Sequence, residues 1–216
     1  SCPQRADRSI KCQCNLERPV RGMEEDTGSI LGDAYDSSQT GMMDEECILI
    51  DDDDNPLGPG SKVLCHLGEG RLHRAFSVLL FDSEGRLLIQ KRAGSKITFP
   101  GVWANTCCSH PLYTPEELED GVGVKRAAIR KLGQELGISS EHVSVDDFQL
   151  ISRLHYQARA DERWVEHEID HVLVIRADFG ETADPSTVEV LYNEGRTRES
   201  QVAQVIIRQI LDEMTF

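Results

Sequence analysis

The chain has 216 residues, a length typical of one domain with appendages, and its hydrophobic fraction of 39% can supply a core. It carries 23 lysines and arginines against 38 aspartates and glutamates, and the resulting formal net charge of −15 repels nucleic acid and anionic lipid at long range. No segment approaches the roughly 18 apolar residues of a transmembrane helix, so we expect neither nucleic-acid nor membrane partners.

Residues 1–44 mix arginine, aspartate, serine, glycine and glutamine with little apolar periodicity. Such a composition cannot bury enough surface to become ordered, so we expect a flexible N-terminal extension followed by one domain over 45–216. The arginines resemble a remnant of an organelle-targeting peptide, but acidic residues interrupt them, and no signal peptide is evident. We therefore expect a cytoplasmic protein, with a plastid or a peroxisome as the alternatives.

Seven cysteines are an odd number, and their spacing is not that of a secreted disulfide framework, which indicates a reducing compartment. Cys12 and Cys14 could bind a metal, but no second cysteine pair lies at zinc-finger distance. Another pair, Cys107 and Cys108, stands just before His110 in "GVWANTCCSHP". This stretch is compatible with a structural cysteine pair, with a metal site, or with a reactive thiolate beside a metal-binding histidine.

The predicted elements alternate between strand and helix patterns. "CILI" at 47–50 reads as a strand that ends at four aspartates and an Asn-Pro turn, and residues 73–92 read as two strands joined by a turn at 82–85. Helical spacing follows up to Leu136, with Gly137 where a helix would end. Two further strands, at 148–158 and 163–179, precede a last helix at 199–216. The sum is a mixed α+β domain.

Three histidines and two carboxylates could meet at one point of this domain. A tight loop between His66 and His73 would bring their imidazoles together, and His110 would add a third. Glu166 and Glu168 are two positions apart on a predicted strand, so both leave the same face, although alternating charges are also typical of a solvated strand. Five such ligands suit a five- or six-coordinate divalent ion better than a tetrahedral structural zinc site.

Basic residues near these histidines predict an anion site. Lys62, Arg92 and Lys96 fall in predicted loops, and in so acidic a chain they would focus a small polyanion, unless they are ordinary surface side chains. Glu135 lies in the last helical turn, where a carboxylate opposes the helix dipole and requires a compensating cation. A Mg²⁺ ion that bridges Glu135 and a diphosphate would provide this charge.

The helix also resembles the Nudix helix, whose carboxylates hold metal for pyrophosphate hydrolysis. The match is partial, because Val122, Lys131 and Gln134 stand where the Nudix pattern has glutamates, while Glu135 is retained. The resemblance implies a Nudix-like mixed β-sheet flanked by helices. It also predicts that hydrolysis by the usual Nudix route would lack its metal cluster.

Four ordered motifs carry a more specific resemblance: "HLGEGRLHRAFSV", "KITFPGVWANTCCSHP", "AAIRKLGQELGI" and "HYQARADERWVEHEID". Over residues 46–180 the chain is similar to the type I isopentenyl-diphosphate isomerases. These enzymes interconvert isopentenyl and dimethylallyl diphosphate by adding a proton to one carbon and removing a proton from another. The resemblance implies a small-molecule prenyl diphosphate substrate, and we expect a monomer.

The resemblance implies which residues form the site, because several positions of this chain match functional positions in the family's motifs. The implied acid and base are Cys108 and Glu168, with Tyr156 near the carboxylate. The implied metal ligands are His66, His73, His110, Glu166 and Glu168, which would hold Mg²⁺, Mn²⁺ or Zn²⁺, while Glu135 would hold a Mg²⁺ ion linked to the diphosphate. Lys62, Arg92, Lys96 and Lys131 would bind the diphosphate, and Lys131 replaces the arginine of many members, which loses bidentate geometry.

The resemblance fades after Asp178, where the family continues into a Pro-Trp segment whose indole faces the substrate. This chain has no tryptophan beyond Trp164, so an aromatic wall that stabilises a carbocation is either supplied by another side chain, such as Phe216, or missing. Two alternatives to an active isomerase therefore stay open. One is a Nudix-type diphosphate hydrolase, and the other is a catalytically weakened relative that binds diphosphates.

Overall fold

The structure is a computed structural model that describes residues 41–94, 97, 99–178 and 189–193. Its strands are β1 Glu46–Ile50, β2 Pro56–Ser61, β3 His73–Phe81, β4 Leu87–Lys91, β5 Trp103–Ala104, β6 Cys107–Ser109, β7 Gln149–Arg159, β8 Val165–Arg176 and β9 Glu189–Asn193. The helices are α3 Lys62–His66, α4 Pro115–Leu118 and α5 Gly123–Leu136, with a 3-10 turn at Val145–Asp147. This combination of strands and helices confirms the predicted α+β class.

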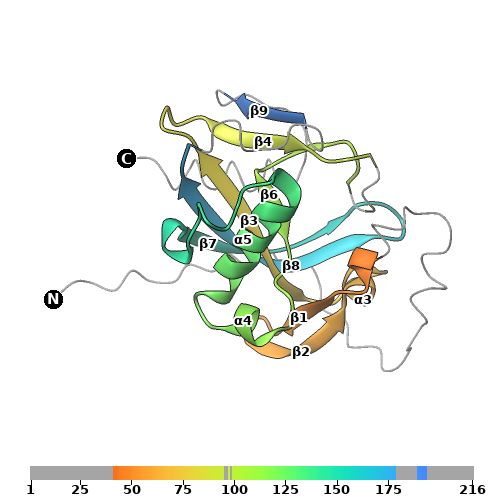
Figure 1. The fold of residues 1–216 in the computed structure, drawn as a ribbon. Coiled ribbons are helices and arrows are strands. Elements are labelled where there is room, and N and C mark those ends of the chain that lie inside the picture. Colours follow the sequence, from red (N-terminus) through yellow and green to blue (C-terminus); the bar gives the residue numbers. More distant parts are fainter. Residues whose placement is uncertain (1–40, 95–96, 98, 179–188, 194–216) are drawn as a thin grey trace.

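One long strand, β3, organises the mixed sheet (Figure 1). The strand order is β2-β1-β3-β4-β5, while β6 also pairs antiparallel with β3, and β8 pairs parallel with it. Strand β7 pairs with β8, and β9 pairs with β4. Because β3 contacts four other strands along its length, residues from distant parts of the sequence meet around its first half.

Helix α5 covers the sheet face that holds the largest group of buried apolar side chains. Ala127, Ala128 and Leu132 are fully buried against Phe76 of β3 and its neighbours. The helix is capped by Gly137, whose φ of 68° is left-handed and favours glycine. The N–H groups of Gly137 and Ile138 donate to the carbonyl oxygens of Gly133 and Leu132. The predicted helix and its predicted end are both confirmed.

Strand β2 was absent from the sequence-based expectations, because "PLGPGS" contains two prolines and two glycines. Proline lacks an N–H group and is tolerated on edge strands, and β2 indeed lies at the end of the strand order. Its partner β1 confirms the predicted "CILI" strand. The predicted pairs of strands at 73–92 and 148–179 correspond to β3 with β4 and β7 with β8.

Lys62 was expected in a loop, and this expectation is wrong, because Lys62 begins the short helix α3 and His66 ends it. Buried Val63 packs this helix against Met43 and Trp164. Met43 thus lies in the core although it precedes the predicted domain boundary at residue 44. That boundary itself stays a prediction.

The expected helix at 199–216 lies outside the described residues. None of the described helices is long and apolar enough to cross a membrane.

Candidate active site

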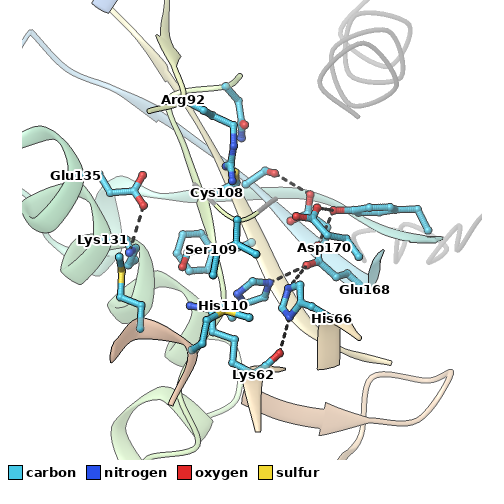
Figure 2. Close-up of a pocket in the computed structure, with 18 residues that line it drawn as sticks. Lys62, His66, Arg92, Cys108, Ser109, His110, Lys131, Glu135, Glu168 and Asp170 are labelled. Atoms are coloured by element: carbon cyan, nitrogen blue, oxygen red, sulfur yellow. Dashed lines mark hydrogen bonds and ion pairs between the residues drawn. The ribbon is translucent and has the colours of Figure 1, made fainter. Parts of the chain in front are cut away.

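Three imidazoles form a compact group at the start of β3. His66 ends α3, His73 begins β3 and His110 follows β6, and each pair of ring centroids is 4.8 Å apart. The parallel pairing of β3 and β8 places His73 beside Glu168. Figure 2 shows the Glu168 side chain next to those of His66 and His110. The structure brings the three histidines together, as the sequence led us to expect.

Backbone carbonyls determine which ring nitrogen carries the proton in two of the imidazoles. Nδ1 of His66 lies 2.8 Å from the Lys62 carbonyl oxygen, and Nδ1 of His73 lies 2.7 Å from that of Arg71. A carbonyl oxygen can only accept, so each Nδ1 donates a hydrogen and each Nε2 is left with its lone pair when the ring is neutral. Both Nε2 atoms are directed at Glu168.

The four side chains have the donor set and the spacing of a divalent metal site. Oε1 of Glu168 lies 2.7, 3.4 and 4.0 Å from Nε2 of His110, His73 and His66. One ligand atom from each of the four residues lies within 4.8 Å of all the others. His73 Nε2 and His110 Nδ1 are buried without a hydrogen-bond partner, and burying such atoms is costly. The residues therefore fit a metal ion.

Burial keeps two of the imidazoles neutral. It lowers the pKa of His66 well below the usual range, and it lowers that of His110 to about 4 although Glu168 opposes the shift. Burial also disfavours the charged form of His73, but the nearby Glu168 carboxylate outweighs it and raises the pKa of His73 to about 9. Burial disfavours an ionised Glu168, yet hydrogen bonding to His110 holds its pKa well below the usual range. A metal ion requires this ionised carboxylate.

Cys108 and Tyr156 line the same pocket as His66, His110 and Glu168. Burial raises the pKa of the Cys108 thiol to about 12, although the Arg92 guanidinium, 3.6 Å from Sγ, works in the other direction. Tyr156 donates a hydrogen bond of 2.5 Å to Oε2 of Glu168, and burial raises its pKa well above the usual range. Cys107 is turned away and packs in the core under α5.

Glu166 lines the pocket together with Glu168, as expected for alternate residues of one strand face. It does not belong to the group of four ligands, however, and its Oε2 lies 3.4 Å from the Tyr156 hydroxyl. His167 and His171 leave the opposite face of β8, and His171 contacts Asp54 there. The structure thus brings four of the five expected ligands together and places the fifth beside them.

Three of the four expected cations surround the pocket, which Lys62, Arg92 and Lys131 all line (Figure 2). Lys62 pairs with Glu45 at 2.7 Å, and the buried Lys131 pairs with Glu135 at 3.2 Å within α5. The cation that Glu135 was expected to require is therefore present on its own helix. Lys96 lies outside the described residues.

The pocket also contains residues that the sequence reasoning missed. Ser77 donates a 2.7 Å hydrogen bond to Oδ2 of Asp170, and the other oxygen of this fully buried carboxylate has no hydrogen-bond partner. Strand alternation could have identified Asp170, which follows Glu168 by two positions. The apolar Met42, Met43, Phe76 and Ile97 complete the lining, and no sequence signal distinguished them from core residues.

Comparison with known proteins identifies the family. The chain matches the NUDIX domain family over residues 71–201. It is 50% identical over 186 residues to an isopentenyl-diphosphate delta-isomerase of Aspergillus fumigatus. The aligned region covers 78% of this chain and 66% of the relative. The isopentenyl-diphosphate delta-isomerase 1 of Bos taurus is 47% identical over 163 residues, covering 73% of this chain and 72% of the relative.

A crystal structure of a Deinococcus radiodurans protein shares the fold, with a TM-score of 0.52 at 19% identity, covering 76% of this chain and 98% of that one. Together with the NUDIX domain match over residues 71–201, this likeness confirms the Nudix-like fold that was expected from the helix. The chain spans about two thirds of the length of the Aspergillus relative and somewhat more of the bovine one. The chain belongs to the isopentenyl-diphosphate delta-isomerases, which are built on the Nudix fold.

Proposed function

We propose that this pocket is where the chain interconverts isopentenyl and dimethylallyl diphosphate, with Cys108 and Glu168 as the acid and the base. The reaction adds a proton to the terminal methylene carbon and removes one from the carbon two bonds away, so it needs two proton-transfer groups around the hydrocarbon. The observation that carries the proposal is that the Cys108 thiol and the Glu168 carboxylate, held on different strands, line one pocket.

Neighbouring side chains hold these two groups in place. Arg92 lies against the Cys108 sulfur, and the Tyr156 hydroxyl bonds to the Glu168 oxygen that does not face the histidines. Phe76, Ile97, Met42 and Met43 line this pocket and would exclude water from the hydrocarbon end of the substrate. Water exclusion matters because a carbocation that forms in this reaction would otherwise be trapped as an alcohol.

Two divalent ions belong to the proposal. His66, His73, His110 and Glu168 would hold one ion, Mg²⁺, Mn²⁺ or Zn²⁺, and Glu166 lies close enough to the pocket to assist. When bound, this ion supplies positive charge that stabilises the Glu168 carboxylate. Glu135 would hold a Mg²⁺ ion with the substrate's diphosphate, and Lys62, Arg92, Lys131 and Lys96 would contact the phosphates.

We also propose that the enzyme is a cytoplasmic monomer. The four cysteines of the described part are free thiols, which supports a reducing compartment. The exposed large apolar side chains found there, Leu57, Tyr113 and Leu150, belong to separate elements rather than to a common interface patch. Residues 1–44 would be an extension whose last part, at Met42 and Met43, joins the pocket lining, and 45–216 would be the isomerase domain.

Incubation of the protein with labelled isopentenyl diphosphate and Mg²⁺, followed by acid, tests the activity, since the allylic product hydrolyses in acid and the substrate does not. We expect acid-labile label without release of phosphate. Release of phosphate or diphosphate before acid treatment would instead indicate the hydrolase. Tight binding in calorimetry without any product would indicate the weakened relative, and either result would contradict the isomerase proposal.

A further inference from the structure

His110 lies just beyond the end of a strand, and the sheet does not fix its position. Strand β6 ends at Ser109, and the next paired residue is Leu112, which forms an isolated bridge with Cys47. Pro111, between them, has no N–H group. On the two sides of Pro111, the His110 carbonyl and the Leu112 N–H both form hydrogen bonds to side chains.

An ion pair between two helices holds both groups. Arg130 of α5 donates from Nε to Oε1 of Glu117 of α4 at 2.7 Å, and from an Nη to Oε2 at 3.0 Å. The same Nη lies 3.2 Å from the His110 carbonyl oxygen, and Oε2 of Glu117 accepts from the Leu112 N–H at 2.6 Å. A bidentate pair thus holds the chain on both sides of Pro111.

The helices approach closely enough to keep this pair rigid. Glu117 is 7% exposed, and its own N–H bonds to the side chain of Thr114, which caps α4. A Cβ atom at Gly123 would lie 2.0 Å from the Glu117 carbonyl oxygen, so this approach requires glycine at the start of α5. The position of the Glu117 carboxylate is set by packing as well as by charge.

We propose that Glu117 and Arg130 are positioning residues for the metal site, which they serve by fixing the backbone of His110. The inference rests on the proposed function of the four ligands. A ligand on an irregular segment gains affinity when the segment is held in its binding conformation before the ion arrives, because less ordering is then required on binding. Neither Glu117 nor Arg130 is among the residues that line the pocket.

The chain offers a matched control on the same two elements. Arg126, one turn before Arg130, pairs with Glu119 and donates to the Glu116 carbonyl oxygen at 2.8 Å. This second ion pair also joins α5 to the α4 region, but its partners lie outside the His110–Leu112 segment. A loss that is specific to Arg130 therefore separates positioning of His110 from general attachment of the helix.

The experiment measures Mn²⁺ binding to the full chain without substrate, from the paramagnetic resonance signal of the free ion. Arg130→Lys keeps a charge for Glu117 but cannot form the two parallel bonds and reach the His110 carbonyl as well. Glu117→Gln removes the carboxylate. We expect roughly tenfold to hundredfold weaker Mn²⁺ binding in both variants. Arg126→Lys should bind Mn²⁺ like the wild type, and thermal unfolding should confirm that all three are folded.

An exchanged pair, Glu117→Arg with Arg130→Glu, tests the role further. It restores charge pairing between the helices but can neither donate to the His110 carbonyl nor accept from the Leu112 N–H. We expect its thermal stability to recover relative to either single reversal while Mn²⁺ binding stays weak. Wild-type affinity in Arg130→Lys and Glu117→Gln would overturn the inference. Absence of Mn²⁺ binding in the wild type would instead overturn the proposed metal site itself.

Discussion

Cys108 lies directly opposite Ser77 in the antiparallel pair of β6 and β3. This pairing directs the Cys108 side chain into the pocket, while the adjacent Cys107 turns into the core beneath α5. Two neighbouring thiols thus have separate surroundings because successive residues of a strand point to opposite faces.

Replacing Cys108 with alanine is expected to lower kcat by roughly 10²- to 10⁴-fold, the usual contribution of a general acid or base. The fold should be preserved, because the side chain lies at a pocket wall. Steady-state kinetics with isopentenyl diphosphate measures the effect. Cys47→Ala removes a buried thiol outside the pocket lining and should retain kcat. A Cys108→Ala protein with wild-type turnover would rule out this residue as acid or base.

Tyr156→Phe removes the hydroxyl that bonds to Oε2 of Glu168 at 2.5 Å and keeps the ring. Since hydrogen bonds to charged groups contribute about 1.5–3 kcal/mol, we expect kcat to fall by roughly tenfold to hundredfold. KM should change little, because Tyr156 is proposed to act on the carboxylate rather than on the diphosphate. A change confined to KM would place the hydroxyl on the substrate instead.

The two proposed ions should respond to different substitutions. Glu135→Gln is expected to raise the Mg²⁺ concentration that gives half-maximal activity and to leave Mn²⁺ binding in the absence of substrate unchanged. His73→Asn should weaken that Mn²⁺ binding by at least about tenfold, because it removes one of the ligands. Activity titrations with Mg²⁺ and binding titrations with Mn²⁺ separate the two sites. Equal effects of both substitutions in both titrations would argue for a single site.

Asp54 should make the free energy of unfolding depend on pH in the acidic range. Burial disfavours its charge, but hydrogen bonds and charges from His171 and Arg74 outweigh this and lower its pKa below the ordinary 3.8. The unfolded chain therefore binds the proton more readily, so the stabilisation is full above about pH 4 and is lost as pH falls through the lower folded-state value. Asp54→Asn keeps a residue that tolerates the φ of 68°.

Urea unfolding of wild type and Asp54→Asn between pH 2 and pH 7 measures this contribution. Near neutral pH we expect the variant to be less stable by about 3 kcal/mol, the usual cost of removing one partner from a buried ion pair. The difference should shrink as the pH falls below about 4. A difference that does not vary with pH would show that Asp54 acts through packing rather than through its charge.

The sequence predicted those parts of the fold that follow from local periodicity. Apolar residues recur at clear strand or helix spacing in the segments that form β3, β7, β8 and α5, and Gly137 identified the helix end. Strand β2 could not be found in this way, because its pairing depends on its position at the sheet edge rather than on its own composition. Helix α3 has only five residues, too few for a helical pattern to emerge.

The candidate site was predicted as a set of residues but not as a geometry. Family motifs supplied His66, His73, His110 and Glu168, which the structure brings together. The sequence could not indicate that Glu166 stands apart from this group, since alternation places both glutamates on one face and says nothing of their distance from the histidines. The contact of Arg130 with the His110 carbonyl depends on where two helices cross, which no local pattern reveals.

The parallel pairing of β3 with β8 has a consequence for the order of folding. His73 and Glu168 are adjacent in space but 95 positions apart in sequence. Pairings over such distances form slowly because a long loop must close first. During synthesis, the three histidines leave the ribosome well before Glu168 does. We therefore expect the pocket to be among the last parts of the domain to acquire its final shape.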